Sequence, residues 1–332
     1  MLNRRDFFIS AGQAAPPKGF WLHVNRTAMA CRFEVTLPGS ESEGVEVARQ
    51  ALDEIDELEG QLTVFRETSE VSFVNRQAAL RPVQIEKSLF DLLILSKQLY
   101  RDTDRAFDVT AGPLSRCWGF MRRQGRLPEA SELEQLNPLI GSDKVILDEP
   151  SRTVRFAWLG MEINFGGIGK GYALDRVAIR IRERVCSALL SAGSSSMRAI
   201  GAGDAGHSGW VVGIRHPRKL KHRLAVLRIR DCAMSTSGSE EQFFELNGKR
   251  FGHIIDPRSG QPAEGVSSVT VVAPSAAETD ALSTAFYVGG SELAARYCDN
   301  HPGTLAILLE RNAERAMILG SNPSCEVNLI DG

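Results

Sequence analysis

The chain has 332 residues, with 39 Lys and Arg against 41 Asp and Glu and a formal net charge of −2 at pH 7. This balance gives no support for nucleic-acid binding, which needs a basic surface. Hydrophobic residues make up 43% and charged residues 24%, as in an ordinary globular enzyme. The chain is long enough to bury a large core, as one domain or two lobes, and contains no run of about 20 apolar residues that could span a membrane.

The N-terminal segment combines an export-like feature with features that argue against export. Arg4 and Arg5, followed by two phenylalanines, resemble a twin-arginine motif. An export signal also needs an apolar stretch of about 7–15 residues, and here the apolar run ends after Ile9 without a lipobox cysteine. We interpret residues 1–22 as a disordered tail or degenerate leader and residues 23–332 as a single domain. Localisation stays open, with the cytoplasm slightly favoured.

Hydrophobic periodicity predicts the elements of the first third of the chain. We expect a strand over residues 27–37 and an acidic amphipathic helix over residues 42–62. The inner stripe of that helix is formed by Val45, Ala48, Leu52 and Ile55. Ser88 is expected to cap a second helix that continues to Tyr100 and carries an apolar face. The members of that face are Leu89, Leu92, Leu93 and Leu99.

The remaining chain alternates loops with strand-like runs. A polar stretch from 122 to 143 is expected to be a loop with a short helix at 131–136. Further strands are predicted at 144–147, 154–158, 211–214, 224–229, 268–272 and 305–309. The basic run 215–223 reads as a solvated hairpin loop, although it could also contact an acidic partner protein. Hairpin spacing and few βαβ units favour an α+β protein with largely antiparallel sheets covered by helices.

The segment 252–284 ends in a helix that carries possible metal ligands. Ser275 and Glu278 form a capping box, and the glycine pair 289–290 supplies a stop. Asp280 and Thr284 are four residues apart, so their side chains share one face of the helix. A carboxylate beside a hydroxyl offers hard oxygen ligands that suit Mg²⁺ better than zinc. Taken alone, such a pair is more often an incidental surface pair.

A loop upstream of this helix presents an imidazole. His253 precedes a turn made by Asp256 and Pro257 and closed by Gly260. The turn would hold His253 in a fixed place, where it could carry a proton or contact a phosphate oxygen. The alternative is a histidine whose hydrogen bonds are satisfied within the turn.

A glycine-rich block provides a second element that could handle phosphate. Residues 161–165 read as a strand, residues 166–171 contain four glycines and Lys170, and a helical pattern follows from Tyr172. The start of a helix favours anions, and Lys170 adds a point charge for phosphate. The block lacks the spacing of a Walker A loop and of G-x-G-x-x-G. A tight turn without ligand is the simpler alternative.

These motifs occur together with others in a fixed order. They lie at residues 29–35, 69–75, 106–114, 118–120, 164–175, 235–238, 253–260 and 280–284. In this order they resemble the ApbE family of FAD:protein FMN transferases, over roughly residues 27–310. One such block would be weak evidence, whereas the ordered set is specific.

The resemblance implies a fold and a reaction. The family's fold consists of α+β lobes of the T-fold type with FAD in the cleft between them. In its reaction, FAD binds with Mg²⁺ on its diphosphate, and a Thr or Ser hydroxyl of an acceptor protein attacks the FMN phosphorus. AMP leaves, and the acceptor keeps FMN through a phosphoester bond. FAD is thus a substrate and Mg²⁺ the cofactor.

The resemblance also implies roles for individual residues. The metal ligands would be the carbonyl of Gly167 and the side chains of Asp280 and Thr284. The catalytic residues would be His253 and Asp280. The flavin and phosphate contacts would come from Met29, Phe65, Ala106, Phe107, Asp108, Asn164, Lys170 and Ile254.

The chain departs from the family pattern at several of these positions. Asn164 stands where Asp is common, and Phe65 where Tyr is common. Residues 193–196 replace the usual Gly-Gly-Asp, and Ser239 with Glu240 replaces an aromatic residue. Two other functions therefore stay open. One is a Mg²⁺-dependent FAD pyrophosphatase that releases FMN and AMP, and the other is a non-catalytic FAD-binding protein.

The six cysteines are scattered, at positions 31, 117, 186, 232, 298 and 325. No C-x-x-C pair or zinc-ligand spacing occurs among them. Because their neighbours are apolar, we expect buried thiols rather than disulfides. The acceptor protein and the oligomeric state are beyond what the sequence shows.

Overall fold

The computed structural model describes residues 20–39, 41, 43–203, 208–219, 221–238 and 242–330. Most of the expected leader over 1–22, with Arg4 and Arg5, lies outside these residues, as do Ser42, Ser239 and Glu240. Trp21 and Leu22 belong to the first strand.

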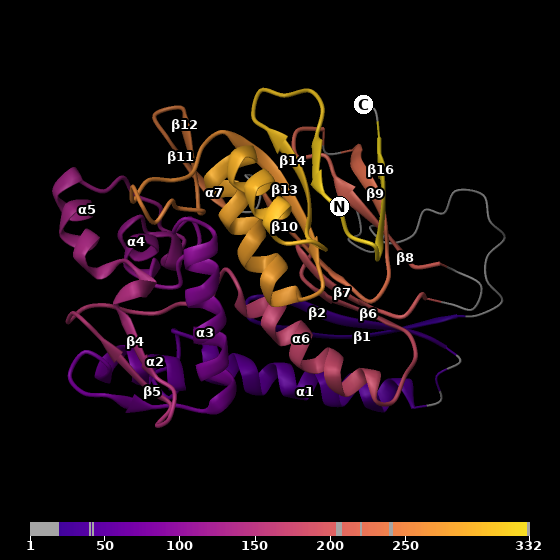
Figure 1. Cartoon of the computed structure of the whole chain (residues 1–332), viewed down its shortest axis with the longest axis horizontal. Coiled ribbons are helices and arrows are strands. Elements are labelled where there is room, and N and C mark those ends of the chain that lie inside the picture. Colours follow the sequence, from indigo (N-terminus) through magenta and orange to yellow (C-terminus); the bar gives the residue numbers. More distant parts are fainter. Residues whose placement is uncertain are drawn as a thin grey trace.

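An antiparallel sheet forms the centre of the protein (Figure 1). Its strand order is β1-β2-β6-β7-β10-β13-β14-β15, and every neighbouring pair is antiparallel. The strands are β1 (Trp21–Ala28), β2 (Cys31–Pro38), β6 (Ala188–Ala192), β7 (Ser196–Ile200), β10 (Ala233–Gly238), β13 (Val266–Ala273), β14 (Leu305–Glu310) and β15 (Met317–Gly320). This arrangement confirms the predicted α+β class with antiparallel sheets.

The two faces of this sheet are covered differently. On one face lie α1 (Gly44–Leu62), α6 (Gly169–Arg182) and α7 (Ala276–Asn300), as Figure 1 shows. On the other face packs a small antiparallel sheet of β8 (Trp210–Arg215), β9 (Arg223–Ile229) and β16 (Cys325–Leu329). Successive strand residues alternate between the faces. Val271 accordingly joins the core under the helices, whereas Val272 joins the core under the small sheet.

A group of short elements packs beside α7. It comprises α2 (Glu70–Gln77), α3 (Lys87–Asp102), α4 (Gly112–Cys117), α5 (Ala130–Leu136), β3 (Val83–Gln84), β4 (Val145–Asp148) and β5 (Thr153–Phe156). Short 3₁₀ turns lie at Phe120–Arg122, Asn137–Leu139 and Ser142–Lys144, and β11 (Phe243–Leu246) pairs with β12 (Lys249–Gly252) as a separate hairpin. Leu89 of α3 and Val154 of β5 share the core under the helices. A cleft between lobes stays a prediction.

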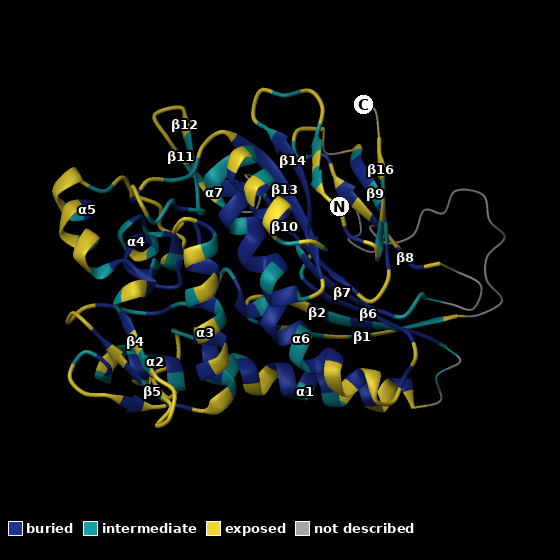
Figure 2. Cartoon of the chain, viewed as in Figure 1, coloured by how far each residue is buried: buried dark blue, intermediate teal, exposed yellow. Residues whose placement is uncertain are grey.

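The amphipathic helices form largely where their patterns place them, with two corrections. In α1, the predicted inner residue Val45 is 57% exposed, and its neighbour Val47 is buried instead. Figure 2 shows the alternation of buried and exposed positions along this helix. Ser88 does not cap α3. Glu86 does, because its carboxylate accepts from the backbone N–H groups of Ser88 and Leu89.

The strand expected over residues 27–37 is wrong in its first part. The chain reverses at Met29 and Ala30, so β1 and β2 form a hairpin in which Ala28 faces Cys31. Both turn residues have positive φ, 48° and 58°. Such a two-residue turn normally uses Asn or Gly, which tolerate this conformation. Met-Ala carries no turn signal, and for this reason the hairpin was not predicted.

Of two further expectations about the glycine segments, one is wrong and one is confirmed. Residues 161–165 form no regular strand, although the backbone of Asn164 donates to the carbonyl of Val109. The predicted stop at the glycine pair 289–290 is present as a break, because Gly290 leaves helical geometry (φ 72°, ψ −168°). A second helical segment follows across this kink to Asn300 and was not predicted. Leu293 and the following apolar residues of that segment pack into the core.

The cysteines are free, as expected, but less buried than expected. Only Cys232 and Cys298 are buried, Cys186 is exposed, and Cys31, Cys117 and Cys325 are intermediate. Apolar neighbours in sequence did not predict burial, because several of these residues lie at element ends. None of the described helices has the length and apolar character needed to cross a membrane.

Candidate active site

The site begins where the N-terminal ends of α6 and α7 meet. The carboxylate of Asp280 on α7 accepts the backbone N–H of Gly171, in the first turn of α6, at 2.8 Å. In return, Asp175 on α6 accepts the hydroxyl of Ser275 at 2.8 Å and the N–H of Ala277 at 2.9 Å, both at the start of α7. The first four N–H groups of a helix lack partners within the helix. Each of these two helices therefore caps the other with a carboxylate.

The three predicted metal ligands are brought together at this junction. A Cβ placed on Gly167 would lie 3.6 Å from the hydroxyl oxygen of Thr284. Thr284 follows Asp280 by one helical turn, and its hydroxyl donates to the Asp280 carbonyl at 3.3 Å. Gly167 precedes Ile168, the N-cap of α6, so the Gly167 carbonyl lies outside the hydrogen-bond ladder of that helix. Gly167 thus lies beside Thr284, one helical turn from Asp280.

This donor set fits a hard cation such as Mg²⁺. All three groups present oxygen, which Mg²⁺ prefers, and two or so protein ligands with water and phosphate oxygens are its usual environment. Within the described residues, no cluster of three or more His, Cys, Asp and Glu side chains is placed to hold a metal. A dedicated zinc-type cage is therefore not formed by this part of the chain.

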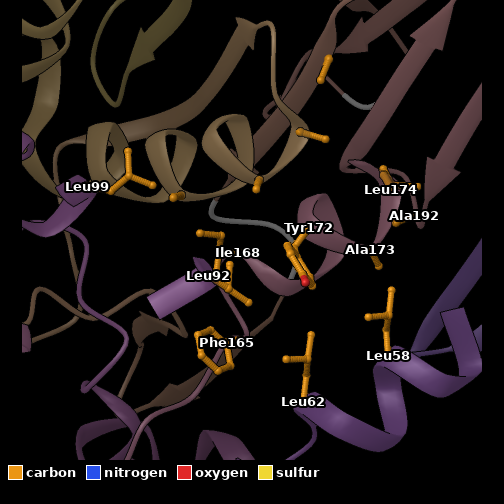
Figure 3. Packing of buried hydrophobic residues seen from close by; sticks show 14 of the residues in the cluster. Leu58, Leu62, Leu92, Leu99, Phe165, Ile168, Tyr172, Ala173, Leu174 and Ala192 are labelled. Carbon is orange, nitrogen blue, oxygen red and sulfur yellow. The ribbon is translucent and has the colours of Figure 1, made fainter. Parts of the chain in front are cut away.

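An apolar layer fixes the glycine turn in place (Figure 3). Ile168 and Tyr172 flank the beginning of α6, and Phe165 precedes the turn. They share one core cluster with Leu62, the last residue of α1, and with Leu92 of α3. Because three separate elements hold this layer, the backbone of the glycine block is held in one position relative to α7.

The positive charge of Lys170 affects the pKa values of two residues from other parts of the chain. Burial raises the pKa of the Cys31 thiol, the charge of Lys170 lowers it, and the charge of Asp280 raises it again. Lys170 also lowers the pKa of His253. Lys170 therefore lies within electrostatic range of Cys31 at the start of β2 and of His253.

His253 is held by its own loop in a defined tautomer. Its Nδ1 lies 3.0 Å from the carbonyl oxygen of Gln242, whose carbonyl also accepts the backbone N–H of His253. A carbonyl only accepts, so Nδ1 carries the proton and Nε2 keeps its lone pair. Burial lowers the pKa of His253. The hydrogen bond to the Gln242 carbonyl raises it, and the positive charge of Lys170 lowers it further. The imidazole is thus a neutral base at pH 7.

The turn 106–110 places Phe107 and Asp108 beside the glycine block. Ala106, Phe107 and Asp108 are buried, and a Cβ on Gly167 would lie 3.4 Å from the Phe107 ring. Asp108 Oδ1 accepts from the backbone and hydroxyl of Thr110 and from Ser142. Its Oδ2 is buried and has no hydrogen-bond partner among the described residues, and burial raises the pKa of this carboxyl. Buried polar atoms are normally hydrogen-bonded, so this oxygen is an exception within the described part of the chain.

The other predicted flavin contacts occupy different surroundings. Asn164 accepts the N–H of Gly166 through its side-chain oxygen at 2.9 Å, which stabilises the turn. Met29 and Ile254 are partly buried against the main core. Phe65 is 73% exposed in the loop after α1, and only its backbone bonds, to Thr63. The role of Phe65 in flavin contact stays a prediction.

Phe65 permits a clean test of flavin contact. We expect Phe65→Ala to leave the melting temperature unchanged, because exposed substitutions alter stability by about 0.5 kcal/mol or less. Loss of ring stacking, about 0.5–1.5 kcal/mol, should weaken FAD binding roughly 2- to 12-fold. FAD titration monitored by flavin fluorescence measures this. Leu159→Ala is a matched control, since Leu159 is 77% exposed, and equal affinities in the two variants would contradict the prediction.

Three residues of the site lie in segments that the sequence analysis singled out, but their partners could not be predicted. Asp175 and Gly171 define the junction of α6 and α7, and Ser196 of β7 donates to Asp280. Each acts on a residue far away in the chain. Local patterns such as capping boxes cannot report such partners, because they compare residues only a few positions apart.

A cavity of about 490 Å³ lies apart from this junction, beside α4 and α5. Arg116, Arg126, Glu132 and Glu162 are among its lining residues. Its charged side chains pair with each other, Arg126 with Glu132 and Arg116 with Glu162. None of the predicted site residues lines it. We place the candidate active site at the helix junction, which holds Asp280, Thr284 and Gly167 and from which Lys170 acts electrostatically on His253.

The fold and the site together define an α+β protein in which oxygen donors lie near the place where the N-terminal ends of α6 and α7 meet. A sequence model of the ApbE family matches residues 29–309, and the chain belongs to this family.

Relatives named FAD:protein FMN transferase are similar in sequence to this chain over most of its length. The protein of Klebsiella pneumoniae (strain 342) is 31% identical over 278 residues, covering 83% of this chain and 85% of its own. That of Escherichia coli (strain K12) is 28% identical over 273 residues, with 80% and 78% covered.

Solved structures agree in fold. The ApbE protein of Thermotoga maritima aligns with a TM-score of 0.82 and 27% identity, covering 91% of this chain and 97% of its own. The flavinyl transferase ApbE of Pseudomonas stutzeri aligns with a TM-score of 0.78 and 27% identity, with 90% and 94% covered.

Proposed function

We propose that this chain transfers FMN from FAD to a Thr or Ser hydroxyl of an acceptor protein and releases AMP. The observation that carries the proposal is the convergence of Gly167, Asp280 and Thr284 at the junction of α6 and α7. The names of the relatives support the activity. Mg²⁺ dependence and the hydroxyl acceptor rest on the chemistry of the donor set and on the family resemblance.

The residues at the junction would hold Mg²⁺ through the Asp280 carboxylate, the Thr284 hydroxyl and the Gly167 carbonyl. When bound, the ion would neutralise charge on the FAD diphosphate and make AMP a better leaving group. Lys170, close enough to shift the pKa of both Cys31 and His253, supplies a further positive charge for phosphate oxygens.

The transfer exchanges the phosphoanhydride bond of FAD for a phosphoester bond to the acceptor. The acceptor hydroxyl oxygen forms a bond to the FMN phosphorus, and the bond between that phosphorus and the bridging oxygen of AMP breaks. The hydroxyl proton passes to Nε2 of His253, which the Gln242 carbonyl leaves unprotonated. The family resemblance assigns Asp108 to the flavin part of FAD, and its buried Oδ2, which has no hydrogen-bond partner among the described residues, supports this role.

The role of His253 predicts a pH profile. Its pKa lies below the 6.5 of an ordinary histidine, so the neutral base persists on acidification. We expect transfer at pH 6.5 to run close to its rate at pH 7.5, with the acid limb falling below pH 6.5. A base with an ordinary pKa would be half protonated at pH 6.5. Steady-state rates of AMP release between pH 5 and 8 measure the profile.

Removing the imidazole of His253 should also remove the acid limb of the pH profile. We expect His253→Ala to lower the transfer rate about a hundredfold or more, in line with loss of a general base. FAD affinity should be retained, because the metal ligands are unchanged. A variant with the wild-type rate and the same acid limb would exclude His253 as the base.

The proposed function is tested by detecting flavin that becomes covalently attached to an acceptor protein. Purified protein is incubated with FAD, Mg²⁺ and an extract of its source cell, then resolved under denaturing conditions. A fluorescent acceptor band that disappears with EDTA supports FMN transfer and gives the mass of the acceptor. Free FMN and AMP without a band would indicate the FAD pyrophosphatase. Intact FAD without a band, in an extract shown to be flavinylated by a known family member, would leave a flavin-binding protein.

A further inference from the structure

Asp280 has a hydrogen-bond partner that the family resemblance did not assign. Ser196 is the first residue of β7, in the sheet beneath α6 and α7, and its side chain is fully buried at 0% exposure. Its hydroxyl donates to Asp280 Oδ1 at 2.5 Å. Asp280 is itself only 5% exposed. This bond therefore forms in an interior where water cannot replace it.

The two oxygens of Asp280 are each held by one donor within the described residues. Gly171 N–H binds Oδ2 from α6, and Ser196 O–H binds Oδ1 from β7. A carboxylate has about four acceptor positions. Two stay available for a cation, while donors from two different elements prevent rotation of the carboxylate plane.

We infer that Ser196 is a positioning residue that orients the Asp280 carboxylate toward the metal and the FAD diphosphate. The inference rests on the proposed function, because it assigns Asp280 as a metal ligand. In this role Ser196 would contact neither the substrate nor the metal. It acts through Asp280, as hydrogen-bonded partners of metal ligands do.

The type of residue at this position matters for the charge of the site. A hydroxyl donates a hydrogen bond without adding charge, whereas an acidic side chain here would lie next to Asp280 and repel it. In this chain Ser196 ends the run Gly193-Ser-Ser-Ser196, and its hydroxyl keeps the contact to Asp280 neutral.

The chain offers a closely matched control in Ser235. Ser235 on β10 pairs with Ser196 across the sheet, and it is also fully buried at 0% exposure. Its hydroxyl bonds to that of Thr279, at 2.9 Å, one residue before Asp280 on α7. Ser235→Ala thus removes a buried hydroxyl bond to the same turn of α7 without touching the carboxylate.

The test compares Ser196→Ala with Ser235→Ala. Mg²⁺ is titrated at a fixed FAD concentration, and two quantities are followed, the melting temperature and the rate of AMP release. Both variants should lose similar stability without ligand. For Ser196→Ala we expect the half-saturating Mg²⁺ concentration to rise about tenfold in both readouts, as for lost partners of metal ligands. For Ser235→Ala we expect a change of less than about twofold.

Each outcome decides the inference. Equal Mg²⁺ dependence in the two variants would assign Ser196 a purely structural role. A wild-type protein whose melting temperature ignores Mg²⁺ in the presence of FAD would overturn the metal assignment itself, and this inference with it. If Ser196→Ala does not fold, Ser196→Cys fills the space that alanine would leave empty and supplies only a weak donor. An unchanged Mg²⁺ dependence in that variant would also overturn the inference.

Discussion

Replacing Asp280 by Asn should abolish Mg²⁺-dependent FAD turnover while the protein stays folded. The amide oxygen can still accept the N–H of Gly171, and the amide nitrogen can donate to Ser196, whose hydroxyl also accepts. The charge that would bind the cation is lost. A metal ion contributes several kcal/mol to such a transition state, so we expect AMP release to fall more than about a hundredfold.

Asp280→Ala should lose the same activity and also lose stability. It leaves the Gly171 N–H and the Ser196 hydroxyl buried without partners, at about 1–3 kcal/mol for each such group. Asp175→Asn is the control, because Asp175 caps α7 as Asp280 caps α6. It should retain the response to Mg²⁺. Unchanged AMP release in Asp280→Asn would remove the metal assignment.

Patterns within one element could be predicted from the sequence. The apolar positions of α3, Leu89, Leu92, Leu93 and Leu99, are all buried. Ser275 caps α7 by accepting the N–H of Glu278. The turn after His253 closes with Gly260 N–H on the Asp256 carbonyl. Each of these features depends on residues a few positions apart, for which propensity and capping rules are informative.

Features that depend on distant partners could not be predicted. The Met29–Ala30 hairpin has positive φ at two residues without a turn preference, and pairing along β1 and β2 imposes it. The glycine pair predicts the break of α7 at Gly290, but not the second helical segment that packs into the core beyond it. At the site, the sequence placed Asp280 and Thr284 on one helix face. The approach of Gly167 and Ser196 required the tertiary structure.

The glycine block itself has a different physical basis from the one its composition indicates. A phosphate-binding turn would use glycine to reach positive φ. None of Gly166, Gly167, Gly169 and Gly171 has positive φ. A Cβ on Gly171 would instead lie 1.9 Å from the carbonyl oxygen of Ala276 and 2.8 Å from the nitrogen of Ala277. Glycine is required there because α6 and α7 touch backbone to backbone.

Gly171→Ala is therefore expected to be the most destabilising single-methyl change in this block. The added methyl meets the backbone of α7, which cannot rotate away as a side chain could. Overpacking of this kind costs about 3 kcal/mol or more when no rotamer relieves it, or roughly 6 °C or more in melting temperature. Separating the helices would also lengthen the bond from Gly171 N–H to Asp280. Activity should fall together with stability, and differential scanning fluorimetry with AMP release measures both.

Gly169→Ala distinguishes close helix contact from a general need for glycine. Gly169 begins α6, and a Cβ there would lie 3.6 Å from Cβ of Phe165, an ordinary contact distance. Alanine favours a helix over glycine by about 0.5–1 kcal/mol. We expect this variant to melt at or slightly above the wild-type temperature and to keep its activity. If both alanine variants destabilised the protein equally, the block would need glycine for its backbone flexibility. The close backbone contact between α6 and α7 would then not explain the glycines.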